Sequence, residues 1–176
     1  MKTVTIFGSS RPKEGEPEFS FAYELGKQLA QNGFRVCNGG YAGVMRASAM
    51  GAKAAGGKTI GVTLGLNTYA HNEFLDETIH CESLFPRVEE LMRRGDAYIV
   101  LQGGTGTLLE LAAVWEFINK RFMPVRPIFV HRPFWDSVVS LMANQLRLEQ
   151  RLPSEHYLRQ FTTVEEVVVG IKSSDW

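Results

Sequence analysis

Cysteine is scarce in this sequence, an excess of charge of either sign is lacking, and no long hydrophobic run occurs. The two cysteines, Cys37 and Cys81, form neither a metal-binding spacing nor a disulfide framework, and we interpret them as buried free thiols in a reducing compartment. Nineteen basic residues balance nineteen acidic ones, so the composition implies no polyelectrolyte partner such as nucleic acid. Any bound anion must therefore be held by local geometry.

Nothing in the chain approaches the roughly 18 consecutive apolar residues that a membrane-spanning helix needs. The first ten residues, MKTVTIFGSS, hold a short apolar run without a small-residue cleavage site, so they predict a first strand and not a signal peptide. We therefore expect a cytoplasmic protein without a membrane partner. No metal site is expected, because the histidines show no ligand spacing. These are His71, His80, His131 and His156.

Apolar runs that end in turn residues alternate with segments of helical spacing along almost the whole chain. The apolar runs predict strands at residues 3–8, 34–38, 58–63, 77–82, 96–102 and 127–131. The helical spacing predicts helices at about 20–33, 42–57, 83–95, 106–119 and 135–145. A last short strand and helix are expected across residues 159–172.

This alternation predicts the α/β class, with one doubly wound, Rossmann-like domain over residues 1–176 and a largely parallel sheet. Residues 11–18, RPKEGEPE, carry two prolines and a glycine and are expected to form an exposed loop. The polar segment 64–77 fits none of the predicted elements, and its position after a strand is suited to a mobile loop beside a site.

Three glycine-bearing turns follow predicted strands, and the carboxyl ends of parallel strands are where doubly wound folds bind their ligands. Glycine lets backbone N–H groups converge on an anion, and a following helix adds unpaired N–H groups and a positive dipole end. We therefore expect a phosphate at residues 103–107, with the other two turns nearby. The candidate binding residues are Gly8, Ser9, Gly40, Gly43, Gly103, Gly104, Thr105, Gly106 and Thr107.

The commoner phosphate motifs do not fit this pattern. A dinucleotide fingerprint that begins at Gly104 would need glycine at position 109, where the chain has Leu109. A P-loop would need Gly-Lys-Ser or Gly-Lys-Thr, which the chain does not contain. Ordinary NAD binding and ATP hydrolysis are therefore unsupported. The alternative that the glycines only form tight strand–helix turns stays open.

Glu110 and Arg87 each allow a structural and a functional interpretation. Thr107 and Glu110 have the spacing of a capping box, in which each side chain satisfies a backbone N–H near the helix start. Arg87 flanks the apolar stripe of its helix and is compatible with an ordinary surface arginine. Pro86 suits the first turn of that helix, which would bring Arg87 near the ligand edge of the sheet.

The stretch QGGTGTLLE at residues 102–110 resembles the Pro-Gly-Gly-x-Gly-Thr-x-x-Glu signature of the LOG ("lonely guy") family. This family comprises cytokinin riboside 5′-monophosphate phosphoribohydrolases and bacterial relatives, many of them labelled "possible lysine decarboxylase". FGSS, GGYAGVMRASAMGAKAAGG and FPRVEELMRRGDAYIVL resemble its other conserved segments, so that the likeness spans roughly residues 3–145. The decarboxylase label finds no support, because no lysine here has the context of a pyridoxal phosphate Schiff base.

The resemblance implies that Arg87 and Glu110 are the catalytic residues and that the glycines and threonine of the signature cradle the phosphate. It also implies a homodimer with sites near the subunit interface and requires no cofactor. Two positions depart from the family pattern. Gln102 stands where the family has proline, and Val88 stands where a lysine often follows the arginine. The apolar residues Trp115, Phe117, Phe122 and Met123 are compatible with a subunit interface and also with core packing.

The function that these residues predict is hydrolysis of the N-glycosidic bond of a purine nucleoside 5′-monophosphate, of the cytokinin or AMP type. The products would be a free base and ribose 5-phosphate. Glu110 would stabilise the positive charge that develops on the ribose and activate water, by analogy with glycosidases. Arg87 would stabilise the leaving base or fix the substrate. The alternative is a non-catalytic nucleotide or nucleotide-cofactor binding protein, which needs the glycine loops but not the Arg87–Glu110 pair.

Overall fold

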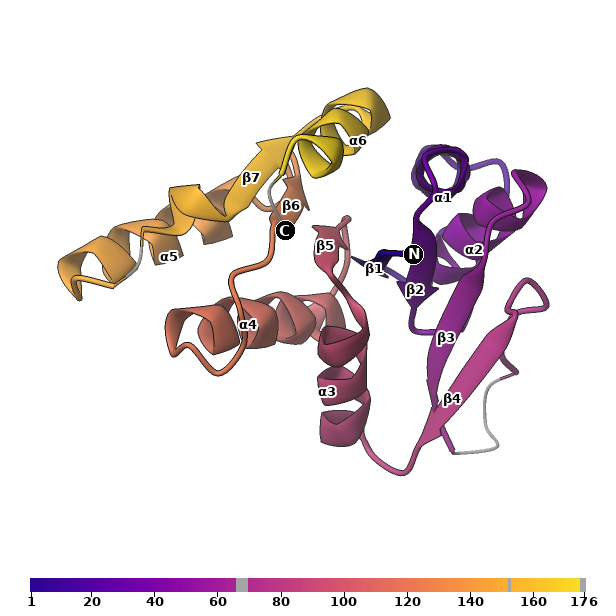
Figure 1. Ribbon diagram of the computed structural model, residues 1–176, viewed down its shortest axis with the longest axis horizontal. Helices are drawn as coiled ribbons and strands as arrows, with labels where there is room; N and C mark the ends of the chain where they lie inside the picture. Colours follow the sequence, from indigo (N-terminus) through magenta and orange to yellow (C-terminus); the bar gives the residue numbers. More distant parts are fainter. Residues whose placement is uncertain (66–69, 152, 175–176) are drawn as a thin grey trace.

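The computed structural model describes residues 1–65, 70–151 and 153–174 (Figure 1). Its strands are β1 (Thr3–Phe7), β2 (Arg35–Asn38), β3 (Thr59–Leu64), β4 (Glu77–Cys81), β5 (Ala97–Val100), β6 (Ile128–His131) and β7 (Leu158–Phe161). Its α-helices are α1 (Pro17–Gln31), α2 (Val44–Ala54), α3 (Leu84–Arg94), α4 (Thr105–Asn119), α5 (Asp136–Leu148) and α6 (Val164–Lys172). A single 3₁₀ turn spans Ser154–His156 in this part of the chain.

The strands form one seven-stranded sheet in the order β4-β3-β2-β1-β5-β6-β7, and every neighbouring pair is parallel. The chain builds outward from β1 to β4 and then returns to the other side of β1 with β5. The position between β1 and β5 is therefore the topological switch point, where doubly wound folds bind their ligands. The predicted α/β, Rossmann-like fold is confirmed.

Helices cover both faces of the sheet, and each face has its own apolar core. One core joins α1, α2 and α6 to β1 side chains such as Val4 and Ile6. The other joins α3, α4 and α5 to Phe7 and to Tyr98 of β5. Figure 1 shows α3 and α4 on the opposite side of the sheet from α1 and α2. Because both faces are covered, all four residues of β5 are buried, as expected for an apolar run without alternation.

Several predicted boundaries differ from the structure by a few residues, and those of α1 and α5 are examples. Helix α1 begins at Pro17, inside the segment 11–18 that the sequence predicts to be a loop. Proline suits the first position of a helix, because its fixed φ is helical and its missing N–H would be unpaired there in any case. Helix α5 extends to Leu148, three residues beyond its predicted end at residue 145.

The segment 64–77 lies beside the second glycine turn. Residues 66–69 are outside the described residues, so its expected mobility is not tested. The backbone N–H of Asn72 donates to the carbonyl of Gly40 at 2.8 Å, and its amide nitrogen donates to the carbonyl of Tyr41 at 3.1 Å. Asn72 therefore holds the end of this segment against the turn that follows β2. Among the described residues, no helix is both long and apolar enough to cross a membrane.

Candidate active site

The predicted phosphate loop, residues 103–107, follows β5 at the switch point, and its last three residues form the first turn of α4. Gly104 is the N-cap residue, and no side chain caps this helix end. The first backbone N–H groups of an α-helix have no partner within the helix. Those of Thr105, Gly106 and Thr107 are therefore available to an anion, and the positive end of the helix dipole favours one.

Two glycines of the phosphate loop have no structural reason of their own to lack a side chain. A Cβ atom added to Gly104 or Gly106 would meet no atom within 4 Å, and neither residue has a positive φ. A Cβ on Gly103 would instead overlap the side chain of Thr107. Gly103 is thus explained by packing. Gly104 and Gly106 keep open the space in front of the helix N-terminus, as an anion cradle requires.

The other two glycine turns are explained largely by internal packing. A Cβ on Gly8 would lie 2.7 Å from a methyl group of Val44. Gly40 and Gly43 have positive φ angles of 78° and 66°, which L side chains rarely adopt. The carbonyl of Ser9 accepts the N–H of Val44 at 2.9 Å, and the N–H of Ser9 donates to the Gln102 carbonyl at 3.0 Å. These contacts place the three turns side by side at one edge.

The capping-box interpretation of Glu110 is wrong. Helix α4 begins at Thr105, so Thr107 lies inside the first turn and cannot act as the N-cap. A capping box does occur elsewhere, between Thr163 and Glu166 at the start of α6. Glu110 instead occupies the buried stripe of α4, between Thr107 and Val114. A carboxylate in such a stripe is the signal in the sequence that distinguishes this residue from an ordinary helix cap.

Arg87 is buried, so its interpretation as a surface arginine is wrong as well. Only 9% of the residue is exposed, and it lies on the inner face of α3 with Val88 and Leu91. Its Nε donates to the carbonyl of Val62 at 2.8 Å, and its Nη2 donates to the carbonyl of Gly39 at 3.3 Å. The ends of β2 and β3 therefore fix the guanidinium.

The structure brings Arg87 and Glu110 together, although they come from different helices. Nη1 of Arg87 lies 3.7 Å from Oε1 of Glu110. The two groups therefore form an ion pair, but the distance is too long for a hydrogen bond. No described residue donates a hydrogen bond to the Glu110 carboxylate. Burial raises the pKa of Glu110 to about 7, and the nearby Arg87 guanidinium opposes this shift without cancelling it. Near neutral pH the carboxyl group can therefore exchange a proton, as a general base must.

Three residues that the sequence did not single out position this pair. The ring of Tyr41 lies 5.7 Å from the Arg87 guanidinium carbon, in a cation–π arrangement. The buried Asn38 accepts the N–H of Gly40 at 2.8 Å and donates to the carbonyl of Met45 at 2.9 Å. Together with Asn72, it fixes the turn that carries Tyr41. In the sequence, an asparagine at the end of a predicted strand is the feature that could have identified this turn.

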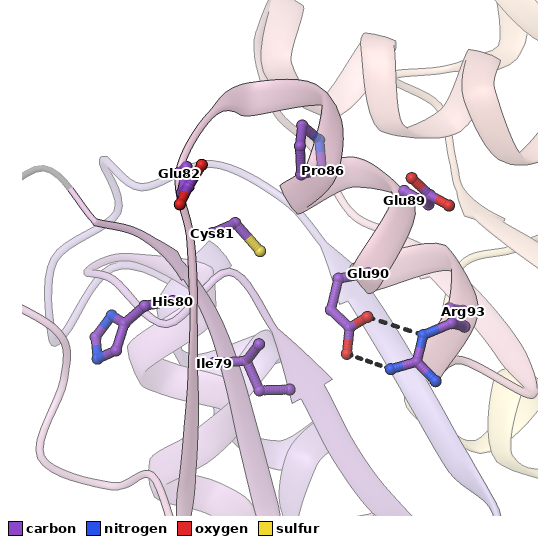
Figure 2. A pocket seen from close by; sticks show the side chains of 8 residues that line it. All are labelled: Ile79, His80, Cys81, Glu82, Pro86, Glu89, Glu90 and Arg93. Atoms are coloured by element: carbon purple, nitrogen blue, oxygen red, sulfur yellow. Dashed lines mark hydrogen bonds and ion pairs between the residues drawn. The ribbon is translucent and has the colours of Figure 1, made fainter.

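A hollow between β4 and α3 lies outside this site (Figure 2). Its volume is about 510 Å³, and three glutamates, Glu82, Glu89 and Glu90, contribute to its wall. Glu90 is already paired with Arg93, as the dashed lines in Figure 2 show. The excess of carboxylates makes this hollow unsuited to a phosphate. The partly exposed Cys81 also lines it, so only Cys37 is the fully buried thiol that the sequence predicts.

A comparison with family models matches residues 1–141 to the SLOG cluster4 family. Among curated proteins, the chain is 35% identical over 116 residues to a Mycobacterium tuberculosis protein named cytokinin riboside 5′-monophosphate phosphoribohydrolase. That match covers 64% of this chain and 62% of the relative. A probable enzyme of the same name from rice is 30% identical over 148 residues, which are 80% of this chain and 59% of the relative. The chain thus spans about three fifths of the length of these relatives.

A solved structure with a different described role is also similar. It is the molybdenum cofactor binding protein from the phototrophic bacterium Rippkaea orientalis, which is 26% identical to this chain. The two superpose with a TM-score of 0.77 over 98% of this chain and 96% of that one. The fold is therefore shared between proteins named as hydrolases and a protein named as a cofactor binder.

Proposed function

This chain belongs to the SLOG cluster4 family, and we propose that it hydrolyses the N-glycosidic bond of a purine nucleoside 5′-monophosphate, of the cytokinin or AMP type. The observation that carries the proposal is the buried Arg87–Glu110 pair beside an uncapped helix N-terminus. The helix N-terminus is suited to bind a phosphate, and Glu110, about one turn further along the same helix, supplies a carboxylate for the sugar. The names of the curated relatives support the same reaction.

In the proposed reaction, the 5′-phosphate binds to the N–H groups at the start of α4. This remote binding energy positions the ribose over Glu110. As the bond between C1′ and the base nitrogen breaks, its electron pair moves to the base, and positive charge develops on the ribose. The ionised Glu110 stabilises that charge and accepts a proton from the water whose oxygen attacks C1′. The base nitrogen takes up a proton from solvent and leaves as the free base, and Glu110 returns the proton of the attacking water to solvent.

Arg87 has two roles in this scheme. Its hydrogen bonds to the carbonyls of Val62 and Gly39 fix it in place, so it can orient Glu110 without reorganisation during the reaction. Its positive charge also lowers the pKa of Glu110 relative to a carboxyl group buried alone, so that more of it is ionised at neutral pH. No step of this scheme requires a metal or a cofactor.

The second candidate function is a non-catalytic nucleotide-cofactor binder. The similarity to the Rippkaea orientalis protein over almost the whole chain favours it. Such a protein needs the phosphate loop but not a titrating carboxylate beside it. Release of base therefore discriminates between the two candidates.

The decisive experiment is a screen of nucleoside 5′-monophosphates for released base, with chromatography as the readout. We expect base from at least one purine nucleotide and none from the matching nucleoside, because the nucleoside lacks the phosphate that anchors it. Binding of the nucleotides without release of base would favour the second candidate. An absence of both binding and release would refute the phosphate loop itself.

The variant Gly104→Ala tests the phosphate loop separately. The added methyl group meets no atom of the protein, so the melting temperature should stay within a few degrees of the wild-type value. The methyl group would occupy the space proposed for the phosphate, so we expect the Kd for AMP to rise by a factor of ~10 or more. Unchanged affinity in this variant, measured by calorimetry, would exclude phosphate binding at Gly104.

We also propose that the protein is a homodimer that joins through a groove between α4 and α5. The groove has a volume of about 440 Å³, and its wall is largely apolar. Leu141 and Met142 line it and are 70% and 41% exposed, which is unusual for neighbouring large apolar side chains. Of the residues expected at an interface, Trp115 is instead buried in the core, whereas Phe122 is 72% exposed.

The variant Leu141→Asp should convert the dimer to a monomer, because it places a charge in the proposed apolar interface. Light scattering coupled to gel filtration would measure the mass. Leu148→Asp is the matched control, since Leu148 is also exposed, at 79%, but does not line the groove. A wild-type protein with the mass of one chain, or a dimer that survives Leu141→Asp, would contradict the proposed interface.

A further inference from the structure

A further cavity adjoins the phosphate loop, and neither Arg87 nor Glu110 lines it. Its volume is about 520 Å³, within the usual range for small-molecule sites. Gly103 and Gly104 form part of its wall, together with Ser9 after β1 and Phe134 after β6. The sheet order places these residues over β1, β5 and β6, whereas the contacts of Arg87 are with the ends of β2 and β3. The residues of this cavity are therefore distinct from the Arg87–Glu110 pair.

The charged groups of the cavity do not match a simple anion. Arg11 lines it and makes no ion pair with any described residue, so its guanidinium is available to a ligand phosphate. Glu16 and Glu18 line the same cavity and outnumber this one positive charge. Glu16 uses one carboxylate oxygen to accept the backbone N–H of Lys13 at 2.8 Å. The remaining carboxylate oxygens suit hydrogen-bond donors such as sugar hydroxyl groups.

An aromatic ring completes the cavity, and its position is fixed. Phe134 is 47% exposed, and its ring packs edge-to-face against Trp135 with centroids 4.9 Å apart. Trp135 is itself anchored, because its indole N–H donates to the carbonyl of Leu101 at 3.0 Å. Such a ring offers an apolar face to a planar base. Gln102 lines the cavity too, so the residue that departs from the LOG pattern adds a carboxamide that can donate and accept hydrogen bonds.

We propose that this cavity binds a second nucleoside, joined to the anchored nucleotide through a phosphoanhydride, so that the preferred ligand is a dinucleoside diphosphate. The phosphate loop would hold the first phosphate, and Arg11 would hold the second. Glu16 and Glu18 accept hydrogen bonds from the ribose of the second nucleoside, and its base stacks on Phe134. The assignment of the first nucleoside to the Arg87–Glu110 side rests on the proposed function. A ligand with a longer phosphate chain is a poorer match, because the carboxylates of Glu16 and Glu18 would repel its additional negative charge.

The test uses calorimetry on the Glu110→Gln variant, which should leave the nucleotides intact, and compares its binding of AMP, ADP and P1,P2-di(adenosine-5′) diphosphate. We expect the dinucleoside diphosphate to bind at least about 10-fold more tightly than AMP, with ADP between them. Phe134→Ala should remove most of the gain from the second nucleoside and leave the Kd for AMP unchanged. Arg11→Ala should remove the gain from the second phosphate. Leu148→Ala is the control, because Leu148 is an exposed apolar residue that lines neither this cavity nor the groove between α4 and α5.

Equal affinity for AMP and the dinucleoside diphosphate would overturn the inference, as would a Phe134→Ala variant that weakens both ligands to the same extent. Failure of the proposed function has a different signature, because the wild-type protein would then bind AMP without release of adenine. Tight binding of the dinucleoside diphosphate, with no release of base by the wild-type protein, would support this cavity and contradict only the hydrolysis. Binding of ADP as tight as that of the dinucleoside diphosphate would assign the cavity to a phosphate and overturn the second nucleoside.

Discussion

The variant Glu110→Gln should release base from its nucleotide substrate about 100-fold more slowly than the wild-type protein, or more slowly still. Glutamine has the same shape but can neither accept the proton of the attacking water nor stabilise the charge on the ribose. Glu110 contributes no N-cap, so the loss cannot be attributed to a frayed helix. Steady-state assays with the substrate found in the screen would measure kcat, and calorimetry would show an essentially unchanged Kd.

Glu116→Gln is the matched control for this prediction. Glu116 lies on the same helix and pairs with Lys120 at 3.7 Å on the exposed surface. Its replacement should leave base release unchanged. If Glu110→Gln hydrolyses the substrate as fast as the wild-type protein, Glu110 is not the catalytic carboxylate.

The same variant tests the raised pKa of Glu110. The ionised carboxylate is the active form, so the wild-type rate at low substrate concentration should rise with pH and level off above about pH 7. In the unfolded chain this group loses its proton near its ordinary pKa of 4.5, but in the folded chain it keeps the proton up to about pH 7. The unfolded state therefore binds fewer protons in this interval. Wild-type stability should decrease from pH 4.5 to pH 7 relative to Glu110→Gln.

The variant Arg87→Met should also lose about 100-fold or more of the activity at pH 7. Among the described residues, the guanidinium is the one charge that lowers the pKa of Glu110, so without it the pKa should rise above about 7 and less of the carboxyl group is ionised. The pH at which the rate is half-maximal should move upward accordingly. A pH–rate profile measures this shift, which a merely structural role of Arg87 would not produce.

Arg87→Met should also destabilise the protein, by roughly 1–3 kcal/mol, because the carbonyls of Val62 and Gly39 lose a buried donor. Arg87→Lys keeps the charge but cannot contact both carbonyls and the carboxylate at once. It should therefore retain more of the wild-type pH profile than Arg87→Met does. A profile that is identical in wild type and Arg87→Met would show that Arg87 does not act on Glu110.

Most of the fold could be predicted from the sequence, because its signals are local. Runs such as residues 96–102 and glycine-bearing turns such as 103–107 mark strand ends without knowledge of their neighbours. The start of α1 was missed because proline and glycine usually indicate a loop, whereas Pro17 occupies a first-turn position. Its helical role depends on the packing of the rest of α1 on the sheet.

The sequence by itself determined the order of strands and helices, the glycine-bearing turn at residues 103–107 and the two residues that resemble a catalytic pair. Only the tertiary structure decided between their alternative roles. Arg87 is fixed by the carbonyls of Val62 and Gly39, which lie 25 and 48 positions earlier in the chain. The environment of Glu110, and with it the raised pKa, arises from packing between α3 and α4. Burial and electrostatic interaction depend on distance in space, which a local pattern does not record.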